Sequence, residues 1–206
     1  APPWNFACSI LTGNITAALI TGNTVIVKPP AESVLVAYKI VQMFWGAGVE
    51  KNVLQFLPCS DEPTGSFLIQ QAKVDLVILT GSTQTAQLFL KMKPRMDLIA
   101  ECGGKNTIIV TNLSDRDQAI KDILASSFSF SGQKCSAASL VICEKSVYND
   151  PVFMQQLKDA VMHLPVGDSW DFSSKIVPLT NISPHKLKRG LSTIDKGEKW
   201  LLKPKQ

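Results

Sequence analysis

Short apolar runs alternate with longer stretches of helical spacing along most of the chain. The short runs are rich in β-branched residues and predict strands, whereas apolar residues three and four positions apart predict helices. The predicted strands are 24–28, 53–57, 74–80, 98–102, 107–110 and 140–143. The predicted helices are 10–20, 34–45, 62–72, 84–91, 115–128 and 151–164. Because strands alternate with helices, the pattern predicts an α/β fold with a right-handed parallel sheet.

The pattern weakens after residue 168, and 175–206 holds few periodic apolar positions. Basic residues gather at this end, from Lys186 to Lys205, whereas elsewhere they are scattered and the net charge is only +4. Nucleic-acid binding would need basic residues interleaved with aromatic ones on one face, so a solvated tail is favoured and no nucleic-acid partner is expected. No apolar run approaches the roughly 20 residues that cross a bilayer, so no membrane span is expected.

The cysteines and histidines do not form a metal motif. The five cysteines include no C-x-x-C pair, and neither His163 nor His185 has zinc-site spacing to a cysteine, so we expect no structural metal. An odd number of cysteines without a signal peptide favours a reducing, cytoplasmic compartment. The chain begins Ala-Pro-Pro-Trp-Asn without a methionine, which favours a piece of a longer chain.

The stretch 131–137, Ser-Gly-Gln-Lys-Cys-Ser-Ala, holds a candidate nucleophile. A cysteine is more often a small buried apolar residue, but Lys134 beside Cys135 can favour the thiolate. Glu101 precedes a glycine pair that leaves a carboxylate room to swing, although a strand-end salt bridge is the simpler interpretation. Asn5 supplies a side-chain amide. Thiol, carboxylate and amide are the nucleophile, general base and oxyanion donor that thiol-based aldehyde oxidation requires.

Two further features lie at the carboxyl ends of predicted strands, where parallel sheets bind ligands. Gly81 and Ser82 join a strand to a helix start, which suits a phosphate group, or else they form a plain glycine turn. Lys28 ends the strand 24–28 and could reach a ribose hydroxyl, or else it is an ordinary surface lysine. The sequence has no G-x-G-x-x-G fingerprint, so a standard Rossmann pyrophosphate turn is not predicted.

Four motifs, taken in order, resemble those of the aldehyde dehydrogenase superfamily: Pro-Trp-Asn-Phe at 3–6, Thr-Gly-Ser-Thr at 80–83, Glu-Cys-Gly-Gly at 101–104 and Gly-Gln-Lys-Cys at 132–135. The resemblance is nearest to the branch that oxidises glutamate γ-semialdehyde, the 1-pyrroline-5-carboxylate dehydrogenases. It implies an aldehyde-dehydrogenase-like α/β fold in which a parallel Rossmann-like sheet segment precedes part of an α/β catalytic domain. The implied domains are a partial NAD-binding domain at 1–102 and a partial catalytic domain, with the thiol, at 103–206.

The resemblance also implies a cofactor and residue roles. The cofactor is NAD, with NADP left open because Ala31 stands where an acidic residue often contacts the ribose. The implied catalytic residues are Cys135, Glu101 and Asn5, the cofactor-binding residues are Lys28, Gly81 and Ser82, and the substrate-carboxylate residue is Ser136. The family's Glu-x-Phe-Gly-Pro motif, whose glutamate holds the nicotinamide ribose, has no counterpart before Gln206.

The implied reaction is oxidation of glutamate γ-semialdehyde to glutamate in proline catabolism, through a cysteine thiohemiacetal and thioester. The stretches 178–180 and 197–201 are similar to bifunctional enzymes in which a proline dehydrogenase precedes this module, and the full-length protein is expected to be a homo-oligomer. Two alternatives stay open, namely a dehydrogenase for another small-molecule aldehyde and a folded piece that is inactive by itself. Relative rates on different aldehydes test the first, and turnover by residues 1–206 alone tests the second.

Overall fold

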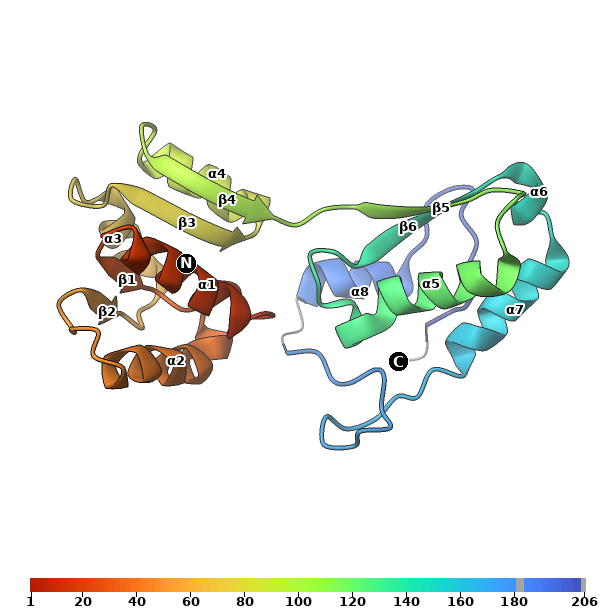
Figure 1. Cartoon of the computed structure of the whole chain (residues 1–206). Coiled ribbons are helices and arrows are strands. Elements are labelled where there is room, and N and C mark those ends of the chain that lie inside the picture. The colour runs from red at the N-terminus through yellow and green to blue at the C-terminus, as the bar shows by residue number, and fades with distance from the viewer. Residues whose placement is uncertain (181–183, 205–206) are drawn as a thin grey trace. The chain divides into compact units, whose positions relative to one another are not determined.

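The computed structural model describes residues 1–180 and 184–204 and divides into two compact units, Ala1–Gly103 and Gly104–Gln206 (Figure 1). The division falls one residue after the predicted domain boundary at 102 and 103. Lys205, one of the basic residues noted near the end of the chain, lies outside the described residues. Each unit has its own strands and its own apolar core.

The first unit alternates strands with helices. Its strands are β1 (Val25–Val27), β2 (Leu54–Phe56), β3 (Leu76–Gly81) and β4 (Asp97–Cys102). Its helices are α1 (Ser9–Ile20), α2 (Val34–Gly46), α3 (Ser66–Gln70) and α4 (Thr83–Met92), with short turns η1 (Ala31–Ser33) and η2 (Asp61–Gly65). β1 pairs in parallel with β2, and β3 pairs in parallel with β4. A helix connects the strands of each pair, as parallel pairing requires.

Two apolar clusters support these strand pairs. In the first, α1 and α2 pack on β1 and β2, and in the second, α3 packs on β3. The buried members are Leu11, Ile15, Val27, Ala37, Val41 and Leu54 in the first cluster and Ile69, Val77 and Met96 in the second. Because Val27 and Val77 belong to these clusters, the clusters hold β1 and β3, the strands that lead to Lys28 and Ser82.

The second unit is a single strand pair with helices packed on it. Its strands β5 (Asn106–Val110) and β6 (Ala138–Cys143) are parallel, with a register shift after Asn106. Its helices are α5 (Arg116–Phe128), α6 (Lys145–Tyr148), α7 (Pro151–Met162) and α8 (Pro184–Ser192), and the turn η3 (Ser129–Gly132) follows α5 directly. Side chains of α5 and α7 form its core with Val110 and Val147. The segment that carries Cys135 therefore runs from a packed helix into a paired strand.

The predicted fold class is confirmed, since strands and helices alternate and the strands pair in parallel. The described residues form three two-stranded ladders and not one continuous sheet. The predicted helix at 62–72 is interrupted, because Glu62, which precedes a proline, has φ and ψ of −121° and 137°. Helix α3 begins only at Ser66.

Two helices occur where none was predicted. Helix α6 spans only Lys145–Tyr148 and is too short to show a period. Helix α8 is polar and basic, and Leu187 and Leu191 are its half-buried residues among those whose side chains are described. Two leucines four positions apart are too weak a pattern to predict a helix. In the described parts of the chain no helix has the length and apolar character needed to cross a membrane.

Candidate active site

Cys135 lies in the loop between η3 and β6, and its side chain is exposed. The turn η3 that leads into the loop has left-handed backbone, since φ is 57° at Phe130, 55° at Ser131 and 71° at Gly132. This region costs a residue with a Cβ about 1–2 kcal/mol, whereas glycine adopts it readily. Such a conformation persists only where surrounding contacts hold it. The contacts of this loop therefore define the site.

Hydrogen bonds tie the start of the loop to a segment far along the chain. The Ser131 hydroxyl donates to the carbonyl oxygen of Val177 at 2.8 Å and accepts from the Val177 N–H at 2.9 Å. The Thr180 N–H donates to Gln133 Oε1 at 2.9 Å. Gln133 Nε2 in turn donates to the carbonyl oxygen of Phe130 at 3.3 Å. These bonds fix the backbone just before Cys135 against residues 177–180.

Asn106, the first residue of β5, holds the loop at Cys135 itself. Its Nδ2 donates to the carbonyl oxygen of Cys135 at 2.6 Å and to that of Ala137 at 3.1 Å. One side-chain amide thus fixes the backbone on both sides of Ser136. This residue lies two positions after the sequence motif at 101–104, and no role was predicted for it. The sequence feature that could have indicated a role for Asn106 is its position at the start of an apolar run, because asparagine is uncommon in strands.

The two cysteines of the second unit differ in surroundings. Cys135 is exposed, as is Ser136 beside it, whereas Cys143 is half-buried near the end of β6. Burial raises the pKa of the Cys143 thiol, and the positive charge of Arg116 opposes this rise only in part. A raised pKa keeps a thiol protonated and unreactive. Cys135 is therefore the better candidate nucleophile of the pair.

Glu101 and Asn5 belong to the first unit. Glu101 is an exposed residue of β4 and lies opposite Thr80 in the ladder. A Cβ built at Gly103 would meet no atom within 4 Å, so the backbone just beyond Glu101 is uncrowded. The room expected for the Glu101 carboxylate to swing stays a prediction. Asn5 is half-buried in the turn that precedes α1.

Lys28 directly follows β1 and forms an ion pair with Asp61 of η2. Its side chain is 20% exposed, whereas that of Asp61 is 91% exposed. No role for Asp61 was predicted, because it lies 33 positions away from Lys28, just before the predicted helix at 62–72. The pair places a hydrogen-bond donor beside an acceptor at the carboxyl end of β1.

Gly81 and Ser82 form the junction between β3 and α4. Ser82 has extended backbone, and its hydroxyl accepts from the N–H of Thr85 at 3.0 Å, so it is the N-cap of α4. The first turn of this ten-residue helix contains no acidic residue. The positive end of its dipole therefore has no carboxylate in that turn to neutralise it. This arrangement suits an anionic group.

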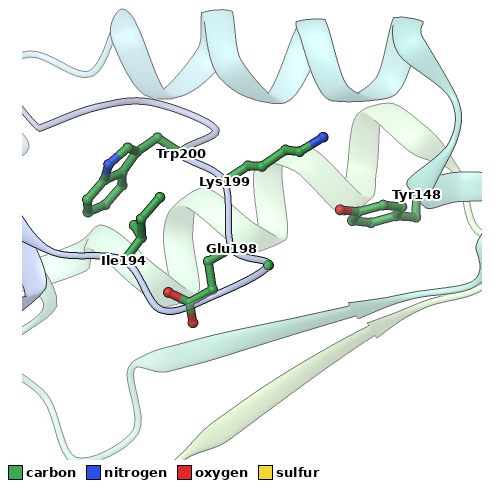
Figure 2. A pocket seen from close by; sticks show the side chains of 6 residues that line it. Tyr148, Ile194, Glu198, Lys199 and Trp200 are labelled. Carbon is green, nitrogen blue, oxygen red and sulfur yellow. The ribbon is translucent and has the colours of Figure 1, made fainter.

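Two surface hollows among the described residues contain none of the predicted site residues. A hollow of about 550 Å³ in the second unit is lined by residues of α6 and of the turn after α8 (Figure 2). Its lining residues are Tyr148, Ile194, Gly197, Glu198, Lys199 and Trp200. A hollow of about 420 Å³ is lined partly by Phe128, Ser129 and Phe130 and partly by 174–176. This second hollow borders the same segment that ties down the Cys135 loop.

Known proteins with similar sequences and structures point to one family. A family model described as the aldehyde dehydrogenase family matches residues 2–202. The 1-pyrroline-5-carboxylate dehydrogenase 1 of Halalkalibacterium halodurans is 34% identical over 205 residues, which cover 96% of this chain and 39% of that protein. The structure of proline utilization A from Corynebacterium freiburgense has 40% identity and a TM-score of 0.92, covering 98% of this chain and 21% of that one. The 1-pyrroline-5-carboxylate dehydrogenase from Thermus with bound NAD has 31% identity and a TM-score of 0.81, covering 87% and 36%.

The chain belongs to the aldehyde dehydrogenase family, because the family model matches nearly all of it. The resemblance inferred from four short motifs is thereby confirmed. Similar curated proteins carry the name of the branch that the finer details favoured, 1-pyrroline-5-carboxylate dehydrogenase. The chain spans 39% of the Halalkalibacterium halodurans protein and 34% of that from Staphylococcus haemolyticus, well under half the length of these relatives.

Proposed function

We propose that this chain carries the thiol and part of the cofactor site of an NAD-dependent dehydrogenase that oxidises L-glutamate γ-semialdehyde to glutamate in proline catabolism. The observation that carries the proposal is the exposed thiol of Cys135, in a left-handed loop held by hydrogen bonds with Asn106, Val177 and Thr180. Strained backbone under such restraint is characteristic of functional sites. The names of relatives support the choice of substrate.

In the proposed reaction, the Cys135 thiolate attacks the aldehyde carbon, forms a C–S bond and leaves a negative charge on the former carbonyl oxygen. The side-chain amide of Asn5 and a backbone N–H at the nucleophile donate hydrogen bonds to that oxygen. Bound NAD accepts the hydride that leaves the same carbon. Glu101 then takes a proton from water as the water attacks the thioester, and the C–S bond breaks to release glutamate and the thiolate.

The residues of the first unit fit a dinucleotide. The start of α4, with its extended Ser82 and no acidic residue in the first turn, suits a phosphate group. The Lys28–Asp61 pair offers a donor and an acceptor to the two hydroxyls of a ribose. The 2′-phosphate of NADP would meet the negative charge of Asp61, so NAD is the proposed cofactor.

Ser136 is proposed to hold the carboxylate of the substrate. It is exposed and directly follows Cys135, and its hydroxyl can donate one hydrogen bond. Glutamate γ-semialdehyde carries a carboxylate, whereas a simple aliphatic aldehyde does not. We therefore expect Ser136 to contribute to the selection between these two kinds of aldehyde.

The intact protein tests the proposal through NADH formation with glutamate semialdehyde. Cys135→Ala should abolish the activity, whereas the matched control Cys143→Ala should retain it. Ser136→Ala should raise KM for the semialdehyde and leave KM for an aliphatic aldehyde unchanged. Full activity in Cys135→Ala would contradict the proposal, and faster oxidation of aliphatic aldehydes would favour a different substrate. Turnover by residues 1–206 alone would exclude the inactive-piece alternative.

Three further expectations concern the whole protein. Fusion to a proline dehydrogenase is proposed because proline utilization A, called bifunctional in one neighbouring structure, matches nearly the full chain. Assembly into a homo-oligomer stays a prediction that scattering from the intact protein tests. A cytoplasmic location is supported by the five free cysteines, since a reducing compartment keeps thiols unpaired.

A further inference from the structure

Ser131 makes two hydrogen bonds with the backbone of a single residue 46 positions away. Its hydroxyl donates to the carbonyl oxygen of Val177 at 2.8 Å and accepts from the N–H of Val177 at 2.9 Å. One hydroxyl can do both, because it has one proton and two lone pairs. Both bonds are partly buried, so water competes with them less than at an open surface.

The partner of Ser131 is itself anchored. Ile176, the residue before Val177, donates its N–H to the carbonyl oxygen of Pro165 at 3.0 Å and accepts from the N–H of Gly167 at 3.0 Å. These two bonds join the segment to the backbone that follows α7. Ser131 is therefore tied to a fixed part of the second unit.

We propose that Ser131 is a positioning residue, which through Val177 holds the left-handed backbone that presents the Cys135 thiol. The inference rests on the proposed function, in which Cys135 is the nucleophile. Ser131 acts through the loop backbone and takes no part in bond making. The hydrogen bond between Gln133 and Thr180 is a second tie between the same two segments.

The conformation of the loop explains why a tie is needed. Phe130 and Ser131 both have a Cβ and both have positive φ, an arrangement that their own preferences oppose. Loss of the Ser131 hydroxyl removes one restraint on these φ values, and a change of φ at this point displaces the residues that lead to Cys135. A displacement of the nucleophile by about 1 Å can lower a rate on the order of 10²-fold.

The test compares Ser131→Ala, Ser131→Thr and the neighbouring control Ser129→Ala in the intact protein. The Ser129 hydroxyl donates to the carbonyl oxygen of Ala125 in the preceding helix α5, four positions away. We expect Ser131→Ala to lower kcat at least ~10-fold, Ser131→Thr to recover much of it by keeping the hydroxyl, and Ser129→Ala to match the wild type. Amide hydrogen exchange should accelerate at Val177 and Thr180 in Ser131→Ala, while alkylation of Cys143 stays slow and reports an intact core.

Three results would overturn the inference. An unchanged kcat in Ser131→Ala would show that the tie is not needed. Unchanged exchange at Val177 would show that the hydroxyl does not hold that segment. A loss of kcat in Ser129→Ala equal to that in Ser131→Ala would show that the effect is not specific to the Ser131 hydroxyl. If Ser131→Ala does not fold, Gln133→Ala removes the second tie, and a normal kcat in that variant would also overturn the inference.

The failure of the proposed function gives a different result. A wild-type protein that oxidises no aldehyde would contradict the dehydrogenase proposal, while hydrogen exchange at Val177 would still decide whether Ser131 holds the segment. A wild-type protein that is active together with a fully active Ser131→Ala variant would contradict only the positioning role.

Discussion

The loop that carries Cys135 and the strand end that carries Glu101 are built in opposite ways. The Cys135 loop has left-handed backbone and is restrained by side-chain hydrogen bonds through Asn106, Ser131 and Gln133. Glu101 is exposed at the end of β4, and the position of Gly103 beyond it is uncrowded. The proposed chemistry accounts for this difference, because a nucleophile must be held in place, whereas a base that acts after hydride transfer has to move toward water.

The largest expected effect on activity comes from Asn106→Asp, which acts on the restrained Cys135 loop. The change removes the donor to the carbonyl oxygens of Cys135 and Ala137 and places a carboxylate against them. We expect kcat to fall on the order of 10²-fold, as for a displaced nucleophile. The control is Asn149→Asp at an exposed position after α6. An active Asn106→Asp variant would mean that the loop does not need this anchor.

Two glycine substitutions sharpen the comparison through stability. Gly132 has a φ of 71°, and a Cβ there would lie 3.2 Å from the Ser127 carbonyl oxygen, so Gly132→Ala should lower the free energy of unfolding by about 1–2 kcal/mol. Gly103 has open space, so Gly103→Ala should be neutral or raise that free energy by about 0.4–1 kcal/mol. Urea unfolding measures both. Equal losses of stability would contradict the contrast between the two stretches.

The same Gly103→Ala variant tests whether Glu101 has to move. If it does, thioester hydrolysis should slow several-fold although the protein is no less stable, because a Cβ narrows the conformations open to the backbone. Pre-steady-state kinetics separates this step from hydride transfer. An unchanged rate of hydrolysis would show that the open surroundings of Glu101 have no catalytic purpose.

Asp61→Asn should have a smaller effect, and this effect should concern the choice between NAD and NADP. The ion pair with Lys28 is largely exposed at Asp61, so its loss should change the free energy of unfolding by no more than about 1 kcal/mol. Removal of the negative charge should lower KM for NADP relative to that for NAD. An unchanged ratio of the two KM values would contradict the proposed part of Asp61 in cofactor choice.

The smallest expected effect is on the pH dependence of stability. Burial raises the pKa of the Cys143 thiol in the folded protein. The protonated Cys143 thiol therefore contributes fully to stability below its pKa in the unfolded chain, which is about 8.5. This contribution is lost as the pH rises through its higher pKa in the folded protein. In Cys143→Ser, thermal unfolding should show a smaller fall in stability at alkaline pH than in the wild type. An equal fall in both proteins would contradict the assignment of this fall to Cys143.

The sequence predicted the local features well and the distant contacts poorly. The apolar run at 107–110 became β5, Asn106–Val110, because a buried parallel strand leaves a continuous apolar signal. The motif around Cys135 supplied the candidate nucleophile, whose role stays a prediction. Its anchors could not be predicted, because Ser131 and Gln133 bind backbone groups of Val177 and Thr180, and any residue type presents such groups. Asp61 was missed for a similar reason, since only folding places it beside Lys28.

The most direct test of the account is peptide-mapped mass spectrometry of the Glu101→Gln variant of the intact protein, quenched after one turnover with NAD and glutamate semialdehyde. Loss of the proposed base should slow hydrolysis, so the acyl-enzyme should accumulate. The account predicts a glutamyl thioester on Cys135. An adduct on Cys8, Cys59, Cys102 or Cys143, or NADH formation without any thioester, would contradict it.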